Sequence, residues 1–210
     1  MNYVPDLDKV LYIGGLAAGG AGIMKLFQWV DEELQNCCKK SLWSIWFCYA
    51  GIIAISLVLT DIPPFGLTWI GLLLLGIYLL VCTVTDSLLY QVYDVMQYLG
   101  ILGGGIWLIG QKTEPRIGFS LIFYALLQYL VLIRMYGKAD GMGYSICSLY
   151  LAGAGMDIEG YLYHMFISFC LLAVVQGIKG NVARKGNLKR AVALYPYISV
   201  GFLIMWIFLF

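Results

Sequence analysis

The chain has 210 residues, of which 12% are Asp, Glu, Lys or Arg and 61% are hydrophobic. Soluble domains carry about 25% charged residues, so this composition argues against a soluble globular protein. A transmembrane barrel is excluded as well, because its strands would alternate polar and apolar residues. The formal net charge of +1 gives no electrostatic reason to bind nucleic acid.

Long charge-free runs alternate with short charged segments along the chain. A helix needs about 17–25 apolar residues to cross a bilayer. The pattern therefore predicts an all-α, polytopic integral membrane protein, a bundle of about eight transmembrane helices. The expected spans are 10–30, 42–60, 65–85, 95–110, 117–134, 140–156, 160–178 and 192–210.

The first expected span follows nine residues that hold two acids and only one lysine, a poor match to the start of a signal peptide. We therefore expect residues 10–30 to be a retained span. Small residues in it form two stripes, and either stripe would let a neighbouring helix approach closely. One stripe is Gly14, Ala18 and Gly22, and the other is Gly15 and Gly19.

Basic residues are distributed unevenly between the two sets of loops that eight spans create. Nine Lys or Arg residues lie on the side that includes 31–41 and 179–190, and three lie on the other side. Positive charge favours the cytoplasmic side, so we expect the first side to face the cytoplasm. Asp86 ends the third expected span and Asp140 begins the sixth, so both fall on this face.

Acids at the edge of a membrane are costly and usually have a partner or a function. On the expected cytoplasmic face these acids are Asp86, Asp94 and Asp140. If Asp86 and Asp140 meet, the two carboxyls would share a proton. Aspartic proteases use this arrangement to activate a water and to protonate the scissile carbonyl. The alternative is that the acids pair with Arg134 or Lys138.

Two segments around these acids resemble the motifs of the type IV prepilin peptidases. Residues 86–94 read Asp-Ser-Leu-Leu-Tyr-Gln-Val-Tyr-Asp and resemble the first motif, an Asp followed after five residues by an Ile-Pro-Asp-like triplet. Tyr93 stands where that family has proline. Residues 137–140 read Gly-Lys-Ala-Asp and are similar to the second motif, Gly-x-Gly-Asp, with Ala139 in place of the second glycine.

A third stretch, residues 191–198, resembles the family's Phe-Gly-Pro-Phe stretch at the start of the last span. The resemblance covers residues 65–210, which would form the aspartic peptidase core, and residues 1–64 would add N-terminal transmembrane helices. It implies that Asp86 and Asp140 are the catalytic residues. The residues it assigns to the substrate-binding motifs are Asp94, Gly137, Ala139 and Gly141.

The resemblance also implies a reaction and a place for it. The implied activity is cleavage of the leader peptide of type IV prepilins, pseudopilins or other pilin-like proteins, at the cytoplasmic face of the bacterial cell membrane. No cofactor and no metal are implied, and the six cysteines show no zinc-binding spacing. The loop at 31–41 is too short for the insert with which larger members methylate the product.

Three other assignments stay open. Tyr93 and Asp94 together also resemble the Tyr-Asp of presenilin-type and signal-peptide-peptidase-type enzymes, whose Pro-Ala-Leu motif this chain does not contain. Asp94 would then be the first catalytic acid. A small transporter could instead use Asp86 and Asp140 as a proton or cation site, although neither is expected in mid-span and no inverted repeat is detectable. The third possibility is a silent family member that acts as an assembly partner.

Overall fold

The computed structural model describes residues 5–36, 39–58, 60, 63–112, 123, 126, 129–130, 137–156, 158–182 and 192–209. Every regular element in these residues is an α-helix, which confirms the expected all-α class for them. The helices are α1 (Pro5–Val30), α2 (Glu32–Asn36), α3 (Lys39–Val58), α4 (Leu67–Leu89), α5 (Asp94–Gln111), α7 (Lys138–Gly153), α8 (Ile158–Val182) and α9 (Tyr195–Leu209).

Each expected span except 117–134 corresponds to a described helix, and 117–134 falls largely outside the described residues. Among the described helices, three stretches are long and apolar enough to cross a bilayer, namely Leu7–Val30, Leu67–Leu89 and Ile158–Ile178. Leu42–Ser56 and Tyr195–Phe208 are apolar but shorter. The described residues therefore form a helical bundle in which three helices are both long and apolar enough to cross a membrane.

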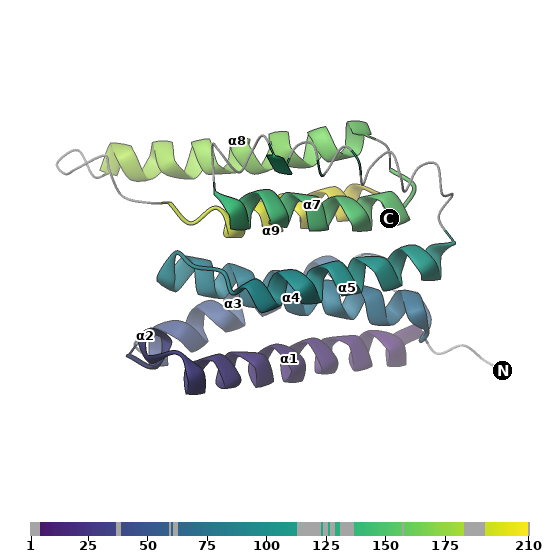
Figure 1. Cartoon of the computed structure of the whole chain (residues 1–210), viewed down its shortest axis with the longest axis horizontal. Helices are drawn as coiled ribbons and strands as arrows, with labels where there is room; N and C mark the ends of the chain where they lie inside the picture. Colours follow the sequence, from purple (N-terminus) through teal and green to yellow (C-terminus); the bar gives the residue numbers. More distant parts are fainter. Residues whose placement is uncertain are drawn as a thin grey trace.

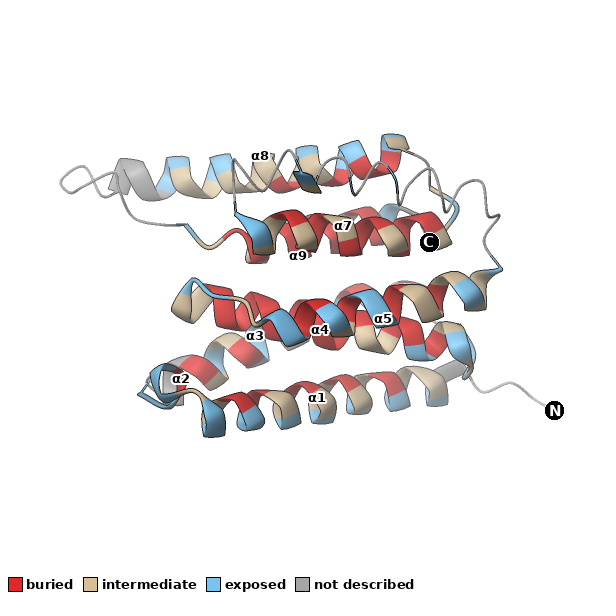
Figure 2. Ribbon diagram, in the orientation of Figure 1, coloured by how far each residue is buried: buried red, intermediate tan, exposed pale blue. Residues whose placement is uncertain are grey.

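Helix α4 is the centre of this bundle. It packs against α1, α3, α5 and α9, and most of its second half is buried (Figure 2). Residues 75–86 of α4 are all buried, so this part of the helix has no solvent-facing side. A helix that is apolar on every face is suited to this position.

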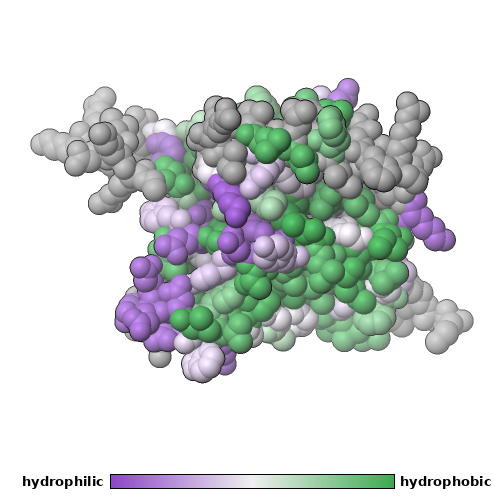
Figure 3. Space-filling view, viewed as in Figure 1, coloured by the Kyte–Doolittle hydropathy of each residue, from purple (hydrophilic) through white to green (hydrophobic). Residues whose placement is uncertain are grey.

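Four helices bring their ends together at one end of the bundle, which we call the site end. Helix α4 ends there, and α5, α7 and α9 begin there, whereas α1 begins and α9 ends at the opposite end (Figure 1). Hydrophilic residues gather toward the site end, and hydrophobic residues cover most of the visible body (Figure 3). The site end is also where Asp86, Asp94 and Asp140 lie.

Only one of the two small-residue stripes in α1 packs against the described helices. A Cβ on Gly15 would lie 3.3 Å from the Leu73 side chain, and one on Gly19 would lie 2.7 Å from Ile77 Cδ1, so this stripe faces α4. No described atom lies within 4 Å of such a Cβ on Gly14 or Gly22. The sequence pattern was equal for the two stripes, and the position of α4 distinguishes them.

Candidate functional site

Asp86 lies inside the last turn of α4, not at a helix end near residue 85 as the sequence predicted. The helix continues to Leu89 and ends where Tyr90 adopts a left-handed conformation with φ 56°, its N–H donating to the Asp86 carbonyl at 3.0 Å. The Asp86 side chain is buried and 7% exposed. Its Oδ2 accepts the backbone N–H of Tyr195, the first residue of α9, at 2.9 Å.

Asp140 occupies the first turn of α7, three residues after Gly137, the glycine that precedes the helix. Gly137 has φ +115°, a conformation that residues with a Cβ rarely adopt. A Cβ at Gly137 would lie 3.7 Å from Asp140 Oδ2, so the half-buried carboxyl group folds back toward the start of its helix. A carboxylate is favoured there because the helix dipole presents partial positive charge at its N-terminus.

The structure brings Asp86 and Asp140 to the same site, from two different helices. Helices α4 and α7, which carry them, both pack against α9. Tyr195 is a physical link between them, since its N–H binds Asp86 and its hydroxyl donates to the carbonyl of Ala139 at 3.3 Å. Lys138 forms no ion pair with either acid within the described residues, and Arg134 lies outside them.

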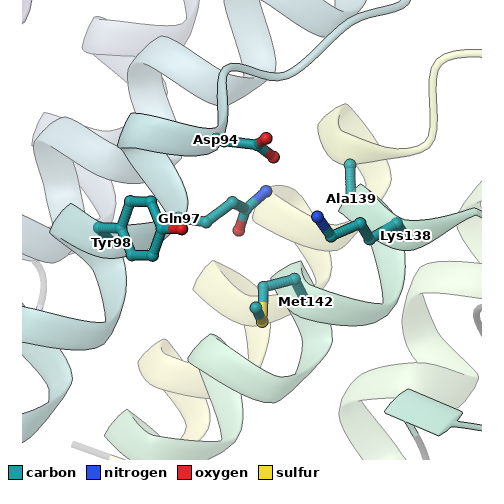
Figure 4. Close-up of a pocket in the computed structure, with 6 residues that line it drawn as sticks. All are labelled: Asp94, Gln97, Tyr98, Lys138, Ala139 and Met142. Atoms are coloured by element: carbon teal, nitrogen blue, oxygen red, sulfur yellow. The ribbon is translucent and has the colours of Figure 1, made fainter.

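A shallow groove opens between the first turns of α5 and α7 (Figure 4). Asp86 and Asp140 are not among the residues that line it, and Asp140 directly follows one of them, Ala139. The exposed carboxylate of Asp94 and the ammonium group of Lys138 extend toward one another across it. Of the predicted motif residues, Asp94 and Ala139 line the groove, Gly137 directly precedes α7, and Gly141 is buried one turn into that helix. The remaining lining residues are Gln97, Tyr98, Lys138 and Met142.

Three residues of this region were not predicted from the sequence, namely Tyr78, Gln97 and Tyr195. All three are buried, and they hydrogen-bond to one another between α4, α5 and α9. Gln97 carried a usable signal, because an amide side chain within an apolar span needs a partner. Tyr195 lies in the stretch 191–198 that the sequence marked, but its contact with Asp86 could not be predicted, because a backbone N–H makes it and a sequence does not display backbone contacts.

The connection between α4 and α5 is fastened to the N-terminal helices. The Tyr93 hydroxyl donates to Asp31 Oδ2, and the rings of Phe27 and Tyr93 pack with centroids 4.1 Å apart. Asp31 also accepts the N–H groups of Glu33 and Leu34 and so begins the short helix α2, which the sequence analysis treated as loop. The hydrogen bond from Tyr93, followed by these N–H groups, holds the pKa of Asp31 below its usual value.

The arrangement can perform proton transfer between two carboxyls and a water beside a groove open to the surface. No group of three or more His, Cys, Asp or Glu residues that could hold a metal ion occurs within the described ranges. No protein-family model, curated protein or solved structure matches the chain. The geometry of the site and the sequence motifs are therefore the basis for a functional proposal.

Proposed function

We propose that the chain is a membrane-embedded aspartic endopeptidase that cleaves the leader peptide of type IV prepilins or pilin-like proteins. The observation that carries the proposal is the placement of Asp86, which is buried, and Asp140, which is half-buried, on two helices that Tyr195 connects. Carboxyls placed in this way share a proton and can act as acid and base in one step. The resemblance of residues 86–94 and 137–140 to the prepilin peptidase motifs supports the choice of substrate.

The hydrogen bond from Tyr195 divides the two roles. A backbone N–H can only donate, so its bond to Asp86 Oδ2 stabilises negative charge on that carboxyl. Asp86 is then the group that accepts a proton from the attacking water. Asp140 is the group that donates a proton to the scissile carbonyl oxygen, and the carboxyls exchange these roles as the amine leaves.

The groove between α5 and α7 is the proposed path of the substrate. Its rim carries one acid, Asp94, and one base, Lys138, on opposite walls. A peptide lying between them could place side chains of opposite charge against the two walls, which would fix its direction. The excess of basic residues in the loops of this side supports a cytoplasmic site in the bacterial cell membrane.

The test compares the wild-type chain with the variants Asp86→Asn and Asp140→Asn. Cleavage of a prepilin is measured in cells that co-express it with each chain, and again with each chain reconstituted in proteoliposomes. Each substitution removes a proton donor or acceptor and should lower cleavage at least about 1,000-fold. Glu159→Gln is the matched control, because Glu159 lies in the first turn of α8 at the opposite end. Wild-type cleavage by either aspartate variant would refute the proposal.

Asp94→Asn separates this proposal from the presenilin-type assignment. Asp94 lines the groove in our account, so the variant should keep cleaving, with a KM raised up to about tenfold. Complete loss of cleavage in Asp94→Asn, together with retained cleavage in Asp86→Asn, would favour the presenilin-type assignment. Proton or cation flux through wild-type proteoliposomes that Asp86→Asn abolishes, with no cleavage of any prepilin, would favour the transporter.

A further inference from the structure

Tyr195 contacts both halves of the proposed active site with different groups. Its backbone N–H donates to Asp86 on α4 at 2.9 Å, and its hydroxyl donates to the carbonyl of Ala139 on α7 at 3.3 Å. Its ring packs on the same helix, since a Cβ added to Gly143 would lie 2.9 Å from the ring. One fully buried side chain therefore spans the two helices that carry the carboxyls.

The Tyr195 hydroxyl is held by two further polar groups. When it donates to Ala139, it accepts from Gln97 Nε2 at 2.9 Å and from the hydroxyl of Tyr78 at 2.6 Å. The Tyr195 hydroxyl is then fully used, with one hydrogen bond donated and two accepted. Such a network fixes its members more firmly than isolated bonds would, because each bond polarises the next.

We infer that Tyr195 is the positioning residue of the aspartate pair, setting the separation and orientation of Asp86 and Asp140. The inference rests on the proposed function and adds a role outside the two motifs. Asp86 is held directly, and Asp140 is held through Ala139, the residue before it. Catalysis by two groups needs their geometry to be fixed within a fraction of an ångström, and a displacement of 1 Å can cost about 100-fold in rate.

The network also connects this positioning to the groove. Gln97 lines the groove and donates to the Tyr195 hydroxyl. A peptide that contacts Gln97 would therefore act, through this hydrogen bond, on Tyr195, the residue that holds both carboxyls. Tyr195 acts through other residues and does not itself touch the groove surface, so its loss should affect turnover more than substrate binding.

Tyr195→Phe is the direct test, and Tyr78→Phe is its matched control. Both positions are fully buried, and each variant removes one hydroxyl from the same hydrogen-bond network. Only the Tyr195 hydroxyl forms a hydrogen bond to α7, at the Ala139 carbonyl. We expect Tyr195→Phe to lower kcat about 10- to 100-fold with KM within about twofold, and Tyr78→Phe to lower kcat less than about threefold. Equal losses, a wild-type kcat in Tyr195→Phe, or an effect on KM alone would overturn the inference.

A distance measurement tests the inference without activity. Spin labels at Tyr90→Cys and Lys138→Cys, exposed positions beside the two acids, are placed in a background without native cysteines. Tyr195→Phe and Gly143→Ala should both broaden or shift the distance distribution, and Tyr78→Phe should not. An unchanged distribution in both test variants contradicts the positioning role. Prepilin cleavage by Asp86→Asn would refute the proposed function, but it would not change the outcome of this distance measurement.

Discussion

The two ends of the α4–α5–α7 packing use polar groups in opposite ways. At the end away from the site, the polar groups of aromatic side chains donate hydrogen bonds to backbone carbonyls. Tyr150 donates to the Gly71 carbonyl at 3.1 Å, and Trp107 donates to the Tyr150 carbonyl at 3.0 Å. At the site end, Tyr78, Gln97 and Tyr195 bond mainly to one another, and Asp86 accepts from another helix.

The backbones also approach each other differently at the two ends. A Cβ on Gly71 would lie 2.8 Å from the backbone N of Trp107, so α4 and α5 are in direct contact away from the site. At the site end, α5 and α7 leave the groove that Asp94 and Lys138 border. The comparison indicates that one end supplies close backbone packing and the other leaves a groove next to the aspartates. Substitutions at each end should therefore separate stability from activity.

Gly71→Ala should have the largest effect on stability. The added Cβ meets backbone atoms of α5, which cannot move aside as a flexible side chain would. We expect a loss of about 1–3 kcal/mol in the free energy of unfolding, measured by denaturation in detergent micelles. Gly14→Ala, where no described atom lies within 4 Å of the new Cβ, is the control and should change stability by less than about 1 kcal/mol. Similar values for the two variants would contradict close packing at this end.

Gly137→Ala and Gly155→Ala compare the two ends of α7 at positions whose backbone disfavours a Cβ in both cases. Both glycines have positive φ, at +115° and +81°, so either alanine should cost about 1–2 kcal/mol. Only Gly137 adjoins Asp140. Prepilin cleavage per folded molecule should therefore fall about tenfold or more in Gly137→Ala and stay near wild type in Gly155→Ala. Equal rates of prepilin cleavage in the two variants would show that Gly137 does not position Asp140.

Acidification should weaken the link between Asp31 and Tyr93, the smallest effect of the three. The pKa of Asp31 is lowered in the fold, chiefly by the Tyr93 hydroxyl. The stabilisation is therefore complete above the unfolded pKa near 3.9 and is lost as pH falls through the lower folded pKa. Solvent screening limits it to less than about 1 kcal/mol.

The measurement for Asp31 is the difference in unfolding free energy between pH 7 and pH 3. This difference should be smaller in Asp31→Asn than in the wild-type chain. Glu32→Gln removes a neighbouring exposed carboxylate and should leave the difference nearly unchanged. An identical pH response in wild type and Asp31→Asn would show that the link contributes nothing.

Charge gaps predicted the helices because a bilayer demands that each crossing segment satisfy its own backbone groups and carry few charges. The same gaps placed Asp86 and Asp140 on one face, because two expected spans separate them. They could not reveal that α4 continues to Leu89, since the left-handed turn at Tyr90 is unusual for a residue with a side chain. The role of Tyr195 depends on where α9 begins relative to α4, and helical periodicity does not encode that relation.

The central claim is that Asp86 and Asp140 act as one catalytic unit. The most direct test is the rate of prepilin cleavage in a double-mutant cycle of Asp86→Asn, Asp140→Asn and the combined variant. If the carboxyls work together, each single variant should lose at least about 1,000-fold, and the combined variant should be no slower than either. Losses that multiply, or a single variant that retains activity, would contradict a shared mechanism.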